Sequence, residues 1–240
     1  GPAITVNLAY RAPLDVDALL AFIAQRAIAG VEAVAPRSIR RTLRAGVFGA
    51  PGWLEAKFLA DAPRVQLSFA PALGAASGAV IAATRRWLDL DAAPSTIAES
   101  LVDLPGAAGL RLPGNIDPFE LAVRAVLGQQ VTVAAARTLA RRLVERFGTE
   151  VATPWTDVAR AFPGPAELAT TPIERIAELG IIRSRAAAIQ ALAAHWGELA
   201  ALFVPGAAPE ALVERLCELP GVGPWTAHYI AMRGLGWPDA

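Results

Sequence analysis

The sequence predicts a two-part protein, with an α+β domain over residues 3–90 and an all-α helical bundle over residues 91–240. Two observations support this division. Alternation of apolar and polar residues, typical of strands with one buried face, is confined to the first part. Past Leu88, alanine-rich segments with helical spacing follow one another, separated by short Pro/Gly stretches. With 240 residues, 54% of them apolar, the chain is long enough to bury a real core.

The first part combines strand patterns with a helix pattern. Strands are expected over residues 4–10, 38–44, 53–59 and 65–69. A helix is expected over residues 16–28. The second strand carries a basic cluster formed by Arg37, Arg40, Arg41 and Arg44. A solvated face explains that cluster better than a phosphate contact. These patterns predict a small antiparallel sheet with helices.

The second part contains six helix patterns. They cover residues 97–103, 117–127, 132–147, 172–179, 184–196 and 209–216. Strand signals nearly vanish here. The second part is therefore expected to be a bundle.

Composition limits the functional classes. Twenty-two basic and twenty-two acidic residues give zero net charge, so nucleic-acid binding would have to come from a local surface. The single cysteine, Cys217, excludes an internal disulfide and a multi-cysteine metal site, which is consistent with a cytoplasmic protein. The longest uncharged run, residues 65–84, contains turn residues and is not expected to span a membrane.

The most informative motif is the string L-P-G-V-G-P-W-T-A at residues 219–227. Its glycines allow a tight turn and close approach to a ligand, and Pro224 suits the first position of a helix. The turn amides and the helix N-terminus would then point at one anion. Helical spacing on both sides predicts a helix-hairpin-helix over residues 209–235, with an ordinary αα-corner as the alternative.

Further stretches carry a family resemblance together with this hairpin. They are residues 15–34, 109–114, 117–131 and 219–234. On these motifs the chain resembles the helix-hairpin-helix superfamily of DNA glycosylases, and within it the 3-methyladenine DNA glycosylase II, or AlkA, type. The resemblance runs from Ile4 to Gly234. It implies base-excision repair of double-stranded DNA carrying alkylated purines such as 3-methyladenine, by hydrolysis that needs no cofactor.

The resemblance also implies a pocket for an extruded base. Trp225 and Tyr229 lie four residues apart on one helix face and match the family's stacking aromatics. Phe22 matches a third pocket aromatic, and Arg26 would line the same opening. Aromatic faces attract a cationic alkylated purine. The alternative is that these rings belong to the core.

Three other roles follow from the resemblance. The DNA backbone would be bound by the hairpin residues Gly221, Val222, Gly223 and Thr226. The wedge that enters the duplex would lie in loop 128–131, at Gln129 and Gln130. At the position of Gln130 the relatives have an aliphatic residue, and a helix-capping loop is the alternative. A sodium or potassium ion would be held by the carbonyls of Cys217, Leu219 and Val222, with the Cys217 thiol packed as a small apolar group.

The chemistry implied is monofunctional. Strand-nicking relatives use a lysine where Trp225 stands here, and the only lysine, Lys57, lies in a predicted strand. The family's catalytic aspartate is expected beyond Ala240, in the part of the bundle that the sequence lacks; Asp239 matches an earlier, non-catalytic position. These 240 residues would then be inactive as they stand.

Two other readings remain open. A noncatalytic helix-hairpin-helix module would bind DNA backbone without chemistry. An oxidised-purine glycosylase is disfavoured because Trp225 replaces its lysine. The chain begins Gly1-Pro2 without methionine, and some relatives carry an upstream alkyl-transfer regulator domain, so such a fusion is an expectation for the parent protein.

Overall fold

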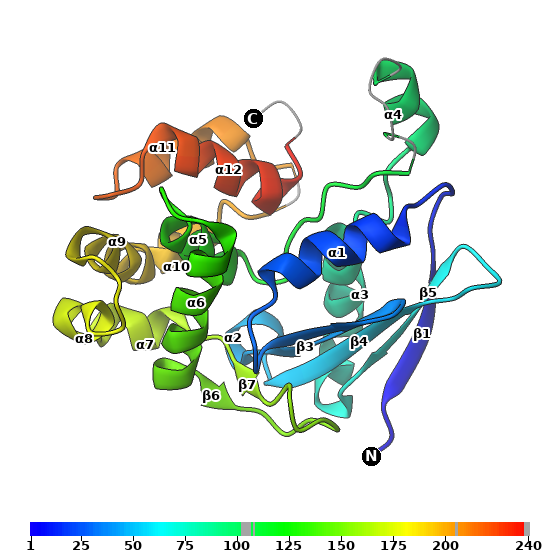
Figure 1. The fold of residues 1–240 in the computed structure, drawn as a ribbon, viewed down its shortest axis with the longest axis horizontal. Coiled ribbons are helices and arrows are strands. Elements are labelled where there is room, and N and C mark those ends of the chain that lie inside the picture. The colour runs from blue at the N-terminus through cyan, green and yellow to red at the C-terminus, as the bar shows by residue number, and fades with distance from the viewer. Residues whose placement is uncertain (102–106, 108, 205, 238–240) are drawn as a thin grey trace. The chain divides into compact units, whose positions relative to one another are not determined.

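The chain forms two compact units (Figure 1). The computed structural model describes residues 1–101, 107, 109–204 and 206–237. The first unit, called the sheet unit here, comprises residues 1–116 and 151–159; the second, the helical unit, comprises residues 117–150 and 160–240. The predicted fold class is confirmed, because an antiparallel sheet with helices is followed by a helical domain.

The sheet unit is built on five antiparallel strands in the order β1-β5-β4-β3-β2. Their bounds are β1 (Ile4–Ala9), β2 (Glu32–Ala35), β3 (Ser38–Leu43), β4 (Gly52–Phe58) and β5 (Arg64–Phe69). Leu54, Ala56 and Phe58 of β4 are buried, whereas the residues between them are partly or fully exposed. This alternation gives the sheet one apolar and one polar face, as the sequence pattern predicts.

Helical segments complete the sheet unit. They are α1 (Val16–Arg26), α2 (Ala45–Phe48), the 3₁₀ helix η1 (Pro71–Ala76), α3 (Ser77–Trp87) and α4 (Pro94–Ser100). The Asp15 carboxylate caps α1 by accepting the Ala18 N–H at 2.9 Å. Of the helix expected over residues 97–103, positions 102 and 103 lie outside the described residues.

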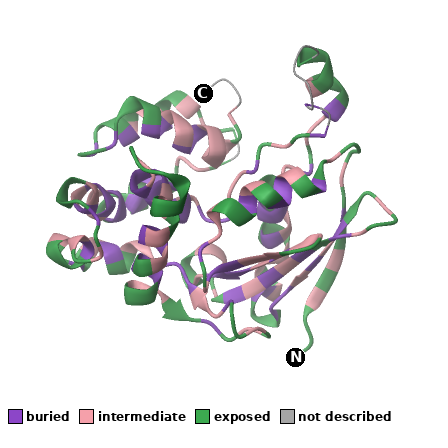
Figure 2. Ribbon diagram, in the orientation of Figure 1, coloured by how far each residue is buried: buried purple, intermediate pink, exposed green. Residues whose placement is uncertain are grey.

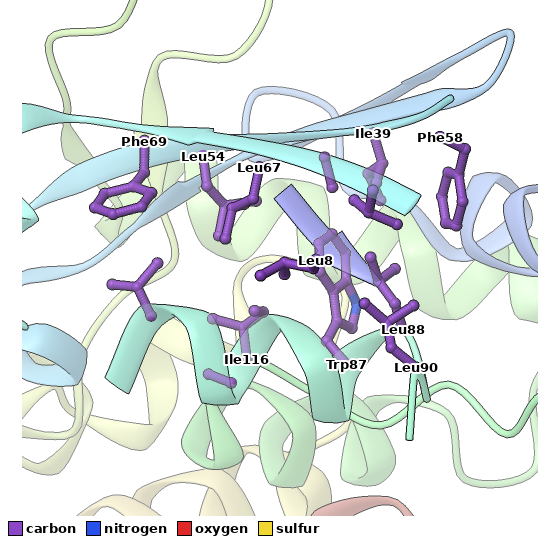
Figure 3. Packing of buried hydrophobic residues seen from close by; sticks show 14 of the residues in the cluster. Leu8, Ile39, Leu54, Phe58, Leu67, Phe69, Trp87, Leu88, Leu90 and Ile116 are labelled. Carbon is purple, nitrogen blue, oxygen red and sulfur yellow. The ribbon is translucent and has the colours of Figure 1, made fainter. Parts of the chain in front are cut away.

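The core of the sheet unit combines residues of the apolar sheet face with residues of α1 and α3. Figure 3 shows the strand residues packed over α3. Leu54, Leu67 and Phe69 from the strands are fully buried. Leu90 and Ile116 belong to the same cluster. Because these later residues pack with the strands, the unit extends to residue 116, past the boundary expected at residue 90.

One sequence expectation about the arginines of β3 is wrong. Arg41 is buried, and its Nη1 donates to Glu32 Oε1 at 2.9 Å, with side chains only 5% and 3% exposed. Strand alternation places it on the face opposite Arg40. The basic cluster is therefore divided between a buried ion pair and the outer face of the sheet.

Residues 151–159 join the sheet unit although their neighbours in sequence are helical-unit residues. The Ala159 N–H donates to the Gly30 carbonyl at 3.0 Å. Trp155 packs edge-to-face on Trp53 with ring centroids 5.0 Å apart, and Asp157 pairs with Arg40 at 2.7 Å. These long-range contacts explain why no local pattern predicted the assignment.

The helical unit contains eight helices and two short strands among its described residues. They are α5 (Pro118–Leu127), α6 (Val133–Phe147), β6 (Thr149–Glu150), β7 (Arg160–Ala161), α7 (Pro165–Thr170), α8 (Ile173–Ala177), α9 (Arg183–Ala194), α10 (Trp196–Ala200), α11 (Pro209–Cys217) and α12 (Pro224–Leu235). Helix α5 is buried at eight of its ten positions and packs against α9 and α12 (Figure 2). It is the central helix on which the hairpin rests.

Within the described residues, no helix is both long enough and apolar enough to cross a bilayer.

Candidate nucleic-acid interface

The predicted helix-hairpin-helix is present as α11 and α12. Leu212 and Leu216 of α11 are buried, as are Ile230 and Ala231 of α12, and the two helices pack against each other. The turn between them spans residues 218–223. The apolar spacing predicted from the sequence thus forms the inner face of the hairpin.

Gly221 is required at the tightest point of the turn. Its φ of +79° lies in the left-handed region. A Cβ at this position would lie 3.0 Å from the Ala188 Cβ and 3.4 Å from the Ser184 carbonyl oxygen, so α9 approaches the turn closely. A side chain here would strain the backbone and displace the turn from α9.

The start of α12 offers backbone donors. Gly223 is the N-cap in an extended conformation, and Pro224 takes the first helical position without losing a needed N–H. The N–H groups of Trp225 and Thr226 belong to the first turn, where an α-helix supplies no acceptor. This geometry suits an anion such as a DNA phosphate.

The aromatic residues predicted to stack on a base lie together on α12. The rings of Trp225 and Tyr229 are nearly parallel, at 9°, with centroids 5.8 Å apart. Trp225 is 73% exposed, the most exposed of the large apolar side chains in the part of the chain described. Core packing does not explain this residue.

Sequence reasoning missed Arg233, which lies one turn beyond Tyr229. Its Nη1 donates to the Tyr229 hydroxyl at 2.8 Å, and its Cζ lies 5.8 Å from the ring centroid. The spacing of Trp225, Tyr229 and Arg233 at i, i+4 and i+8 is a local signal that could have found it.

The predicted wedge loop follows α5. Gln130 is exposed and has a φ of +53°, whereas the Gln129 side chain is bonded to the hairpin at Gly221 and Thr226. Thr226 is only 4% exposed, and its hydroxyl accepts the Gln129 amide. The Thr226 hydroxyl therefore links the loop after α5 to the first turn of α12.

Phe22 and Arg26 lie together on α1 of the sheet unit. The Arg26 Cζ is 3.7 Å from the centroid of the Phe22 ring, and its Nη1 donates to the Phe22 carbonyl at 3.1 Å. Phe22 is partly buried against the sheet core. The grouping of this pair with Trp225 and Tyr229 in one pocket stays a prediction.

The expectation for the Cys217 thiol is wrong, because Cys217 is exposed. It lies at the end of α11, on a side of the helix different from the buried Leu212 and Leu216. Of the three carbonyls predicted to hold a cation, that of Leu219 accepts the Val222 N–H at 3.2 Å. Asp239 lies outside the described residues.

An ion-pair network that sequence reasoning also missed borders the first hairpin helix. Arg215 of α11 pairs with Glu198 of α10 and with Glu218 in the turn. The hydrogen bond from Arg215 holds the pKa of Glu198 below its ordinary value. The pairing thus favours the charged form of Glu198, and the network links the turn to α10.

Comparison with known proteins places this geometry in a family. Residues 5–117 match the AlkA N-terminal domain, and residues 123–221 match the HhH-GPD superfamily base excision DNA repair protein. The DNA-3-methyladenine glycosylase 2 of Escherichia coli K12 is 34% identical over 95% of this chain and 80% of its own length. The chain belongs to the AlkA-type DNA glycosylase family.

Two further proteins extend the comparison. The probable bifunctional transcriptional activator/DNA repair enzyme AlkA of Mycobacterium tuberculosis is 35% identical over 99% of this chain, which spans 48% of that protein. The chain therefore covers about half the length of this curated relative. A 3-methyladenine DNA-glycosylase structure from Archaeoglobus fulgidus has the same fold, with a TM-score of 0.80 at 20% identity over 97% of this chain and 80% of its own.

Proposed function

We propose that the protein is a monofunctional DNA glycosylase that removes alkylated purines such as 3-methyladenine from duplex DNA. The observation that carries the proposal is the exposed Trp225 ring, which is nearly parallel to Tyr229 and lies in the first turn of α12, directly after the glycine turn. An enzyme that acts on a base must extrude it from the duplex and hold it in a pocket. The turn would bind the DNA backbone while the base is extruded, and the exposed ring next to it would hold the extruded base.

The hairpin would hold one strand. Gly221, Val222 and Gly223 allow the main chain to approach a phosphate, and the Trp225 and Thr226 N–H groups point from the helix N-terminus. An extruded base would then stack on Trp225, and a cationic alkylated purine would gain from the electron-rich ring face. Gln130 would be the wedge that enters the duplex.

The reaction proposed is hydrolysis. Water adds its hydroxyl to C1′ of the sugar, the bond from C1′ to the base nitrogen breaks, and the base leaves with the remaining proton. Schiff-base chemistry needs a lysine amine, and the only lysine, Lys57, lies in β4 of the sheet unit. The catalytic aspartate is carried over from the family, and none of residues 1–240 is assigned to it.

A monovalent cation is part of the proposal. The main-chain oxygens of Cys217, Leu219 and Val222 form a donor set of hard, neutral ligands, which fits sodium or potassium better than zinc. Within the described residues, no group of three or more His, Cys, Asp or Glu side chains could hold a metal ion. The cation would supply positive charge next to the phosphate; no other cofactor is proposed.

The cellular setting is proposed from the relatives. Because the Mycobacterium tuberculosis protein is named as both an activator and a repair enzyme, we infer that the parent protein carries an upstream alkyl-transfer regulator domain. Because the proposed substrate is double-stranded DNA with alkylated bases, we also propose a cytoplasmic location.

The test is release of free base. Duplex DNA treated with a methylating agent is incubated with the protein and with its Trp225→Ala variant, and the freed bases are separated by chromatography. We expect 3-methyladenine from the wild-type parent protein and much less from the variant. A folded wild-type parent that releases no base, and that binds abasic and intact duplexes equally, is a noncatalytic DNA-binding module instead.

A further inference from the structure

The Gln129 side chain joins the wedge loop to the hairpin. Its Nε2 donates to the Gly221 carbonyl oxygen at 2.9 Å and to the Thr226 Oγ1 at 3.0 Å. Gly221 lies in the turn, and Thr226 lies in the first turn of α12. A single amide thus spans the end of the α5 loop, the phosphate-binding turn and the helix that carries Trp225.

The backbone of Gln129 makes a further hydrogen bond, to a third element. A guanidinium N–H of Arg185, on α9, donates to the Gln129 carbonyl oxygen. Helix α9 also contacts the turn itself, because Ser184 and Ala188 lie against Gly221. Gln129 is therefore fixed at both its side chain and its main chain by elements that surround the hairpin.

The next residue, Gln130, is exposed at the surface of the loop. It has a φ of +53°, a left-handed conformation that is unfavourable for an L-residue and that neighbouring contacts must hold in place. On the far side of the loop, Thr132 caps α6 by accepting the Ala135 N–H at 3.2 Å. With Gln129 and Thr132 anchored, the exposed positions between them are Gln130 and Val131.

We propose that Gln129 is a positioning residue that sets the wedge Gln130 in register with the phosphate-binding turn before DNA is bound. The proposal rests on the proposed function. Base extrusion requires the wedge to enter the duplex at a fixed distance from the phosphate that the hairpin holds. A preformed link between the two avoids ordering the loop during binding, so less binding energy is lost.

The primary test compares two glutamine substitutions in the chain of residues 1–240. Gln129→Met keeps the side-chain length and removes both hydrogen bonds. Gln190→Met is the matched control, because the Gln190 Nε2 donates to the Thr171 carbonyl at 2.7 Å in the same helical unit. The readouts are the affinities for an intact duplex and for an abasic-analogue duplex, and the fluorescence of 2-aminopurine at the extruded position.

Gln129→Met should reduce the preference for the abasic duplex about tenfold. It should reduce the 2-aminopurine extrusion signal by about the same factor. A loss of about tenfold corresponds to two hydrogen bonds of ordinary net strength. Its affinity for intact duplex should change less than about twofold, since phosphate contacts dominate that binding. Gln190→Met should leave both readouts at the wild-type level. Equal losses in the two variants would overturn the proposal.

A double-mutant cycle separates positioning from general support of the fold. If Gln129 acts through Gln130, Gln129→Met should have no further effect on extrusion in a Gln130→Ala background. Additive losses would show that Gln129 acts on the fold alone. Should Gln129→Met fail to fold, Thr226→Val removes one acceptor from a buried side chain and provides the same comparison. A wild-type chain with no abasic preference contradicts the proposed function rather than this step.

Discussion

Two aromatic pairs, each with at least one tryptophan, contrast packing in one unit with the recognition proposed for the other. In the sheet unit, Trp155 meets Trp53 edge-to-face at an interplanar angle of 76°, and both are partly buried. In the helical unit, Trp225 lies parallel to Tyr229 at 9° and is 73% exposed. Each pair also has an arginine beside it, Arg40 in the first and Arg233 in the second.

The two pairs differ in how much ring surface they leave exposed to solvent. The guanidinium of Arg40 lies 5.4 Å from the Trp155 ring and pairs with Asp157, so the first pair is held by a ring contact, a cation–π contact and an ion pair. Trp225 keeps one broad ring surface in solvent. A packed aromatic pair contributes to stability, whereas an exposed ring offers a surface on which a further ring can stack.

The largest effect is expected from Trp225→Ala. Removing the exposed ring should weaken binding to a duplex with a flipped-out base about 10- to 100-fold, because stacking contributes about 1 to 3 kcal/mol per base. The free energy of unfolding should stay within about 0.5 kcal/mol of wild type, since the indole is mostly solvated. Fluorescence anisotropy and urea unfolding measure the two quantities. A loss of stability without a loss of binding would make Trp225 a packing residue.

Trp155→Ala should produce the opposite result. Loss of the edge-to-face contact and of the cation–π contact should lower the free energy of unfolding of the sheet unit by about 2 kcal/mol. Circular dichroism during urea unfolding follows this change. DNA affinity should remain at the wild-type level in the same preparation. Equal effects of the two tryptophan substitutions on DNA binding would remove the distinction drawn between the pairs.

The fold could be predicted wherever the signals were local. Alternation located the strands β1, β3, β4 and β5 to within a residue or two. Side-chain caps at Asp117 and Thr132 mark the true starts of α5 and α6. Segment 151–159 was assigned to the wrong part because its partners, Gly30, Arg40 and Trp53, are more than a hundred residues earlier in the chain.

The same limit applies to the candidate site. The hairpin glycines and the pair Trp225 and Tyr229 were visible because their roles depend on spacing within one helix and one turn. The bond between Gln129 and Gly221 joins residues 92 apart, and that between Arg185 and Gln129 joins residues 56 apart. No periodicity encodes such contacts, so the supporting residues appeared only in the folded chain.

The smallest effect is expected from removing the ion pair beside Trp155 while the ring contact between Trp53 and Trp155 stays. Asp157→Asn removes the ion pair with Arg40 but leaves both tryptophan rings, so the free energy of unfolding should fall by only about 0.5 kcal/mol in low salt. The loss should shrink in 1 M salt, where exposed charges are screened within about 3 Å. Glu150→Gln is the control, because that carboxylate is 87% exposed and 3.8 Å from Arg160. A loss near that of Trp155→Ala that shrinks in 1 M salt would mean that the ion pair, and not the ring contact, holds segment 151–159 on the sheet.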